Sequence, residues 1–118
     1  MQKTIATPEV IFSAEALALM GGHLPWVKKA VDEGMKFAKK RRVEITKVAV
    51  TRFDSYEDPD LHEAVITFYT EAPQSLEALS RFWANLSDHI GNWEQTLPKS
   101  QQEFFWKSIG IQVEPLSQ

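Results

Sequence analysis

The side chains best suited to chemistry are the carboxylates of a short acidic segment, residues 54–60. Asp54, Glu57, Asp58 and Asp60 supply oxygen ligands of the kind that hard cations such as Ca²⁺ require. The EF-hand pattern is missing, however, because neither its glycine at the sixth loop position nor its glutamate at the twelfth is present. We therefore interpret residues 54–60 as a solvated loop in which Asp and Pro side chains form turns.

The three histidines, His23, His62 and His89, stand far apart in the sequence. His62 and Glu63 form half of the zinc-protease pattern H-E-x-x-H, but Ile66 occupies the place of the second histidine. That pattern also requires a helix, whereas the residues around His62 have the composition of a strand. We therefore assign no metal ligand and expect no cofactor.

Other catalytic signatures are also missing. Cysteine is absent, which excludes disulfides, thiolate nucleophiles and thiolate metal ligands. No serine lies in a G-x-S-x-G or S-x-x-K motif, and the glycines form no nucleotide-binding loop. We assign no catalytic residue, and the sequence leans against an enzyme without excluding one. A small-molecule or enzymatic role would need a pocket between sheet and helices, with Trp83, Tyr69 and His89 as candidate lining residues.

A basic run offers a different kind of binding. It comprises Lys36, Lys39, Lys40, Arg41 and Arg42. Cations at this density could neutralise several phosphates, so the five residues are candidate nucleic-acid contacts of a regulatory or antitoxin-like protein. Against this, the pI is about 5.6 and no helix-turn-helix or zinc-finger pattern accompanies the run. We weigh a solvated helix end above nucleic-acid binding.

Charge is segregated along the chain. Residues 28–52 hold nine basic and three acidic side chains, a net charge of +6. Residues 53–79 hold seven acidic side chains and no basic one, a net charge of −7, although the whole chain carries only −3. Segregated charge creates fields that steer a partner, and two such regions could dock antiparallel across a two-fold axis.

Four aromatic residues are candidate interface residues, namely Trp26, Phe104, Phe105 and Trp106. The last three are consecutive, and successive positions of a helix are rotated by about 100°, so these side chains cannot all face one core. Exposed aromatic side chains are favoured anchors of protein interfaces. The alternative, equally supported, is a short helix clamped between the sheet and a long helix.

Length and composition indicate one globular domain. The chain has 118 residues, of which 43% are hydrophobic and 25% charged, and it shows no linker and no internal repeat. No run approaches the ~20 apolar residues that cross a membrane, and the first residues lack a signal-peptide pattern. We expect a cytoplasmic protein. Whether residues 1–9 are flexible is left open.

The hydrophobic patterns predict an α+β fold: a small antiparallel sheet of three to four strands, with two long amphipathic helices and a short third helix packed on one face. Helices are expected at residues 25–42, 76–97 and 101–106, and strands at 44–53, 61–70 and 109–114, preceded by a strand at 10–12 and a brief helix at 14–20.

Details of these elements follow from particular residues. A bulge near Thr46 and Lys47 reconciles the two parities of the strand at 44–53, which forms a hairpin with the strand at 61–70. An apolar stripe marks the helix at 76–97; it comprises Leu79, Trp83, Leu86, Ile90, Trp93 and Leu97. Ser13 and Ser75 are predicted caps of the helices at 14–20 and 76–97. Ser100 and Glu103 form a capping-box pattern that predicts the start of the short helix.

Missing chemistry, surplus aromatics and segregated charge together favour a non-enzymatic protein–protein interaction module, as a homodimer or with another protein as partner. The first alternative is a nucleic-acid-associated protein that uses residues 36–42. The second is a small-molecule-binding or enzymatic domain of unknown chemistry.

Overall fold

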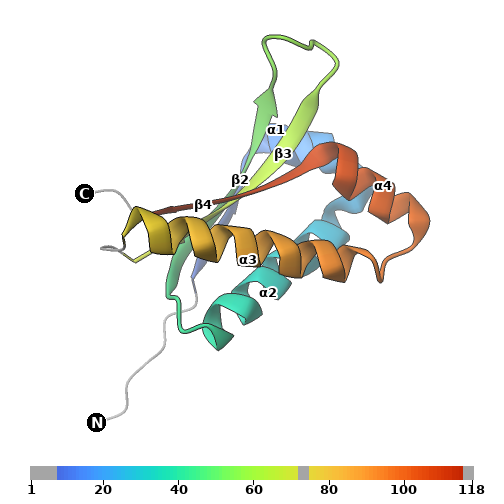
Figure 1. Cartoon of the computed structure of the whole chain (residues 1–118). Coiled ribbons are helices and arrows are strands. Elements are labelled where there is room, and N and C mark those ends of the chain that lie inside the picture. The colour runs from blue at the N-terminus through green and yellow to red at the C-terminus, as the bar shows by residue number, and fades with distance from the viewer. Residues whose placement is uncertain (1–7, 72–74, 116–118) are drawn as a thin grey trace.

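The structure, a computed structural model, describes residues 8–71 and 75–115. Residues 1–7, which make up most of the segment 1–9 whose flexibility the sequence leaves open, lie outside the described residues. Within the described part, the α+β prediction is confirmed, with a four-stranded sheet and helices that pack on it (Figure 1).

The strands lie in the order β1-β2-β3-β4. Their bounds are β1 Glu9–Phe12, β2 Ile45–Asp54, β3 His62–Thr70 and β4 Ile109–Pro115. The sheet is antiparallel only at its centre, where β2 and β3 form the predicted hairpin with a register shift between Ile45 and Lys47. β1 is parallel to β2 and β4 is parallel to β3, so the expectation of a wholly antiparallel sheet needs correction. The physical reason is that helices connect both outer pairs, and such crossovers join parallel strands.

Two helical segments form the crossovers. The first holds α1 Ala14–Met20, the 3₁₀ turn η1 Gly21–His23 and α2 Leu24–Lys40, and the second holds α3 Leu76–Glu94 and α4 Lys99–Ser108. The predicted caps Ser13 and Ser75 accept hydrogen bonds from the backbone at the starts of α1 and α3. The capping box at Ser100 is wrong, because α4 already begins at Lys99 and Pro98 is its N-cap residue.

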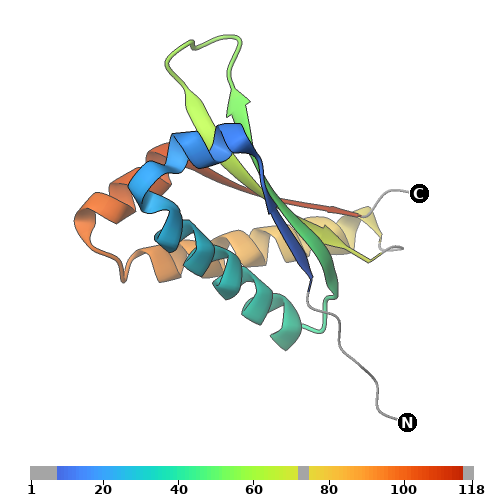
Figure 2. The ribbon, with the colours of Figure 1, turned by 180° about the vertical axis from the view of Figure 1, so that it is seen from behind.

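All helices in the described part of the chain cover one face of the sheet. The even-numbered strand residues Val48, Val50, Ile66 and Phe68 lie in one buried cluster with residues of α1, α2, α3 and α4. Figure 2 shows α1 and α2 following β1 at one edge, and Figure 1 shows α3 and α4 on the β4 side. The predicted packing of helices on one face is therefore confirmed.

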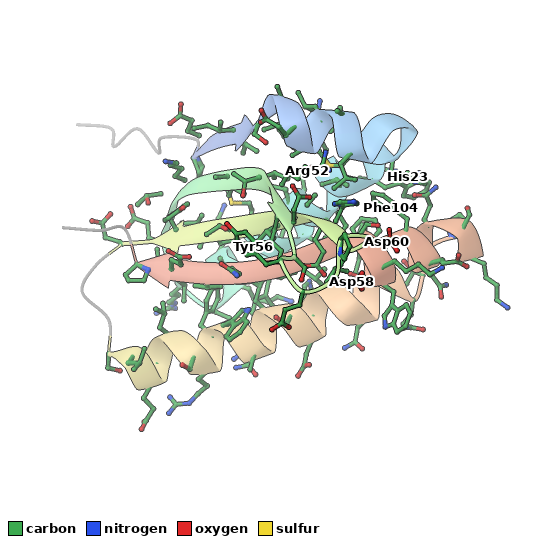
Figure 3. The ribbon with its side chains drawn as sticks, turned by 90° about the horizontal axis from the view of Figure 1, so that it is seen from above. His23, Arg52, Tyr56, Asp58, Asp60 and Phe104 are labelled. Carbon is green, nitrogen blue, oxygen red and sulfur yellow. The ribbon has the colours of Figure 1, made fainter. Side chains whose placement is uncertain are left out.

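The two crossovers have opposite handedness. Both run over the same face, yet the pair β1–β2 points opposite to the pair β3–β4 in a sheet of strand order 1-2-3-4. Both crossovers also advance in the same direction across the sheet, from β1 to β2 and from β3 to β4. Because their strands point in opposite directions, one crossover is right-handed and the other is left-handed. Figure 3 shows the sheet with α2 behind it, and in this view the β1–β2 crossover is the left-handed one. Left-handed crossovers are rare, at about 2% of such connections.

The apolar stripe of α3 is largely buried, as predicted, with one exception. Leu79, Leu86 and Ile90 lie in the interior, but Trp83 is 46% exposed. Its indole Nε1 donates a hydrogen bond of 2.8 Å to the carbonyl oxygen of Ile111 in β4. Trp83 therefore lies against the β4 edge of the sheet instead of in the core.

Candidate interaction surface

The second face of the sheet carries no helix within the described residues. Side chains alternate between the two faces of a strand, so the neighbours of the core residues point to this side. We call it the open face; its residues are Glu9, Ile11, Lys47, Ala49, Thr51, Phe53, Glu63, Val65, Thr67, Tyr69, Gly110, Gln112 and Glu114. Figure 3 views the molecule from this side of the sheet.

The centre of the open face is flat and weakly polar. Ala49 lies opposite Thr67, and Thr51 lies opposite Val65. Thr67 is only 7% exposed because its neighbours shield it, whereas Ile11 and Phe53 at the periphery are 40% and 50% exposed. A surface of small and β-branched side chains lets another sheet or helix approach closely.

The two ends of the open face differ in their charged residues. The row at one end holds Lys47 between Glu9 and Tyr69, with Glu114 beyond Tyr69, and the row at the other end holds Glu63 beside Phe53. At one end, the Lys47 ammonium lies 5.2 Å from the centre of the Tyr69 ring, its cross-strand neighbour. At the other end, Glu63 lies opposite Phe53, and its Oε1 is close to the Gly110 backbone, 3.6 Å from where a Cβ would stand.

The hairpin beyond this end carries an ionic cluster on the helix side of the sheet. Asp54 Oδ1 accepts a hydrogen bond of 2.9 Å from Arg52 Nε and lies 2.7 Å from His62 Nδ1. The hydrogen bond from Arg52, and then that from His62, hold the pKa of Asp54 below its ordinary value. The loop at residues 55–61 is also internally ordered, since the Ser55 hydroxyl accepts from two backbone N–H groups and Asp58 accepts from a third.

The basic run and the acidic loop lie at opposite ends of the molecule (Figure 1). α2 ends at Lys40, the chain turns through Arg42 with φ of 60°, and β2 then runs to the acidic loop. The Val43 N–H donates to the Ala38 carbonyl at 2.8 Å, which closes the helix end with a left-handed residue. The sequence showed segregated charge, and the fold separates the two charges by the length of one strand.

The candidate nucleic-acid residues surround the C-terminal end of α2. Lys36, Lys40 and Arg41 line a cleft of about 380 Å³ between α2 and α3, and Phe37 and His89 also line it. His89 stacks on Phe37 at 4.8 Å and lies 3.3 Å from Glu33. Lys39 and Arg42 are exposed outside this cleft.

The four candidate interface aromatics do not form one patch. Phe105 is 1% exposed and lies in the core, and Phe104 stacks on His23 with ring centres 3.9 Å apart. Trp26 is half-buried, and Trp106 is 81% exposed. Of the three consecutive aromatics, one does point to solvent, as helix geometry requires.

Trp106 borders a cleft of about 410 Å³ at the junction of α3 and α4. Glu94, from the end of α3, lines the same cleft, and burial raises the pKa of its carboxyl. Lys99 and Glu103 complete its charged rim. The cleft offers a carboxylate beside an indole, and among the residues that the structure describes no side chain forms a hydrogen bond with the Glu94 carboxyl group.

The remaining sequence candidates do not converge. Tyr69 points to the open face, His89 faces α2 on the other side of the sheet, and Trp83 lies at the β4 edge. These three side chains therefore do not line one pocket. In residues 8–71 and 75–115, no group of three or more Asp, Glu or His is placed to hold a metal ion, and no helix is long and apolar enough to cross a membrane.

A comparison with known proteins finds no match to the chain among protein-family models, curated proteins or solved structures. A proposal for the function of this chain therefore rests on its own geometry.

Sequence reasoning missed the open face. The signal was present in the alternation of Lys47, Ala49, Thr51 and Phe53, which puts mostly small or polar side chains on one side of β2. Without knowing that every helix packs on the other side, this alternation does not distinguish a solvated face from a docking face.

Proposed function

We propose that the protein is a non-enzymatic protein–protein interaction module whose docking surface is the open face of its sheet. The observation that carries this proposal is that four helices cover one face of the sheet and none covers the other among the described residues. Ile11 and Phe53 expose apolar surface there, beside the half-buried Ala49 and Val65. Removing such apolar surface from water contributes about 25 cal/mol per Å², and the entropy lost on association is subtracted from this gain.

The size of the open face sets the expected strength of docking. Four strands about 4.8 Å apart and seven residues at about 3.3 Å each give a surface of roughly 20 by 20 Å, on the order of 400 Å² per partner. Stable interfaces bury about 800 Å² per partner. The open face alone therefore favours a reversible complex, which charged contacts at its ends would strengthen.

The position of the basic residues at the C-terminal end of α2 favours a protein partner over nucleic acid. Lys39 and Lys40 occupy the last turn of α2. The carbonyl end of a helix has negative polarity, so cations there stabilise the helix, while phosphates prefer the opposite end. We further propose a cytoplasmic location, since the cysteine-free composition suits a reducing compartment.

Site-specific photo-crosslinking in cells tests the proposal. A benzoylphenylalanine placed at Thr51, an exposed position in the middle of the open face, is expected to form a covalent adduct with a protein. The matched control places the same group at Asp32, an exposed position on α2. Adducts at position 51 and none at 32 support the proposal. Adducts at neither position, or equal adducts at both, would overturn it.

A further inference from the structure

Lys47 and Glu63 stand at opposite ends of the open face and on neighbouring strands. Lys47 shares its cross-strand row with Tyr69 and with two carboxylates, Glu9 on β1 and Glu114 on β4, so its ammonium is the cation of that row. Glu63 shares its row with Phe53. The two rows are six residues apart along β2, which corresponds to about 20 Å. No ion pair within the described chain engages either side chain, apart from the contact of Lys47 with the Tyr69 ring.

We propose that the occupant of the open face is a second copy of this chain, packed face to face across a two-fold axis that runs across the strands. The inference rests on the proposed function and names its partner. Rotation about such an axis reverses the strand direction, so the Lys47 row of one copy lies over the Glu63 row of the other. Symmetry repeats this contact at the other end of the interface.

The twist of stacked sheets improves the match. Two packed sheets are rotated by about 30°, which displaces positions 10 Å from the axis by about 5 Å, one strand spacing. In the left-handed sense that stacked sheets adopt, the displacement moves Lys47 from above β2 of the partner to above β3, where Glu63 stands. Two Lys47–Glu63 pairs then flank the flat, weakly polar centre made by Ala49, Thr67 and their symmetry mates.

The wider charge layout agrees with the same axis. Strand reversal brings the acidic loop at residues 55–61 of one copy toward the end of the other copy at which Arg42 leads into β2. An axis parallel to the strands would instead place Glu9 over Glu114 of the partner, because β1 would then lie over β4. Like charges make that arrangement unfavourable.

Charge exchange in the full-length chain tests the axis, with sedimentation equilibrium as the measurement. Lys47→Glu and Glu63→Lys each place like charges opposite each other at both ends, and each is expected to raise the dimer dissociation constant by at least roughly tenfold. An equimolar mixture of the two variants restores opposite charges at both ends, so it is expected to form a heterodimer as tight as the wild-type dimer. Lys28→Glu, on the exposed side of α2, is the matched control and leaves dimerisation unchanged.

Each outcome decides the inference. A wild-type chain that stays monomeric up to about 1 mM overturns it, as does a mixture of variants that fails to associate although circular dichroism shows both to be folded. The proposed function has its own readout, since the adduct at position 51 has twice the chain mass for a second copy and another mass for a different protein. A monomeric chain that crosslinks a different protein therefore refutes the second copy and keeps the docking face.

Discussion

Gly34 of α2 lies directly against the ring of Phe68 in the centre of the core. A Cβ at position 34 would stand 2.7 Å from Phe68 Cε1 and closer still to Cζ, nearer than real Cβ atoms approach. Phe68 is fully buried, so its ring cannot swing away. The backbone of Gly34 has the conformation of an ordinary helix, so no left-handed conformation requires a glycine at this position. The glycine instead allows the close contact between the helix and the sheet.

The first prediction compares two glycines in helices. Gly34→Ala is expected to lower the free energy of unfolding by about 1–3 kcal/mol, because the added methyl overpacks the core. Gly91→Ala, in α3, is expected to raise it by about 0.5–1 kcal/mol, because apart from its chain neighbours and the backbone of its own helix no atom lies within 4 Å of the new Cβ, and alanine favours the helix. Urea denaturation measures both, and equal effects of one sign would contradict the packing described.

The second prediction concerns Glu94, whose pKa burial raises above its ordinary value of 4.5. The ionised carboxylate is therefore disfavoured in the folded chain at neutral pH, and Glu94→Gln is expected to be more stable than the wild type at pH 7. The difference should disappear as the pH falls below 4.5, where the carboxyl is protonated in both folded and unfolded states. Denaturation curves at several pH values check this, and a gain that persists at low pH would point to another cause.

At the scale of elements, Trp83 protects an edge of the sheet. Carbonyl groups of successive strand residues point to alternate sides, and the Glu114 carbonyl faces β3, where Thr70 Oγ1 lies 3.5 Å away. The Ile111 carbonyl therefore points outward, and the Trp83 indole satisfies it. Covering an edge in this way limits pairing with other chains.

The third prediction removes that donor. Trp83→Phe keeps most of the packing but loses the bond to Ile111, so the free energy of unfolding is expected to fall by about 0.5–1.5 kcal/mol. Hydrogen exchange of β4 amides should become faster. Trp106→Phe is the control, because its side chain is 81% exposed, and a change below about 0.5 kcal/mol is expected. Equal losses in both variants would contradict an edge-covering role.

Local patterns predicted the elements better than their pairing. The bulge near Lys47, the hairpin and the caps at Ser13 and Ser75 depend on residues close in sequence, and all of them are present. The parallel pairs could not be read, because no residue of β1 encodes which distant strand it will join. The prediction that Trp83 lies in the core was wrong, because its position in the apolar stripe does not show that the β4 edge of the sheet lies beside it.

The candidate site was predictable only in part. The segregated charge is visible in the sequence, whereas its placement at the two ends of β2 needs the fold. Phe105 was a candidate interface residue in the sequence, but in the structure its ring lies in the core.

At the scale of the whole molecule, the basic end of α2 and the acidic loop make an electrostatic dipole (Figure 1). The fourth prediction is that self-association weakens with salt. Between about 0.05 and about 0.5 M ionic strength the dissociation constant should rise roughly tenfold, because exposed charges are screened over distances of about 10 Å or less. Sedimentation at several salt concentrations measures this slope. Lys47→Ala combined with Glu63→Ala should reduce it, and a slope that this pair does not alter would place the charged contacts elsewhere.

The left-handed path from β1 to β2 has a consequence for the order in which the chain assembles. Because its crossover is left-handed, the unit formed by β1, α1, α2 and β2 is expected to form slowly by itself. The unit formed by β3, α3, α4 and β4 has the common right-handed crossover. Pulse-labelled amides during refolding should therefore become protected first in β3 and β4, and last in the four residues Glu9–Phe12 of the edge strand β1. Early protection of β1 would contradict this. If this order holds, β1 pairs last with a sheet whose other three strands have already formed. It is then also the strand expected to detach first under mechanical force or on heating.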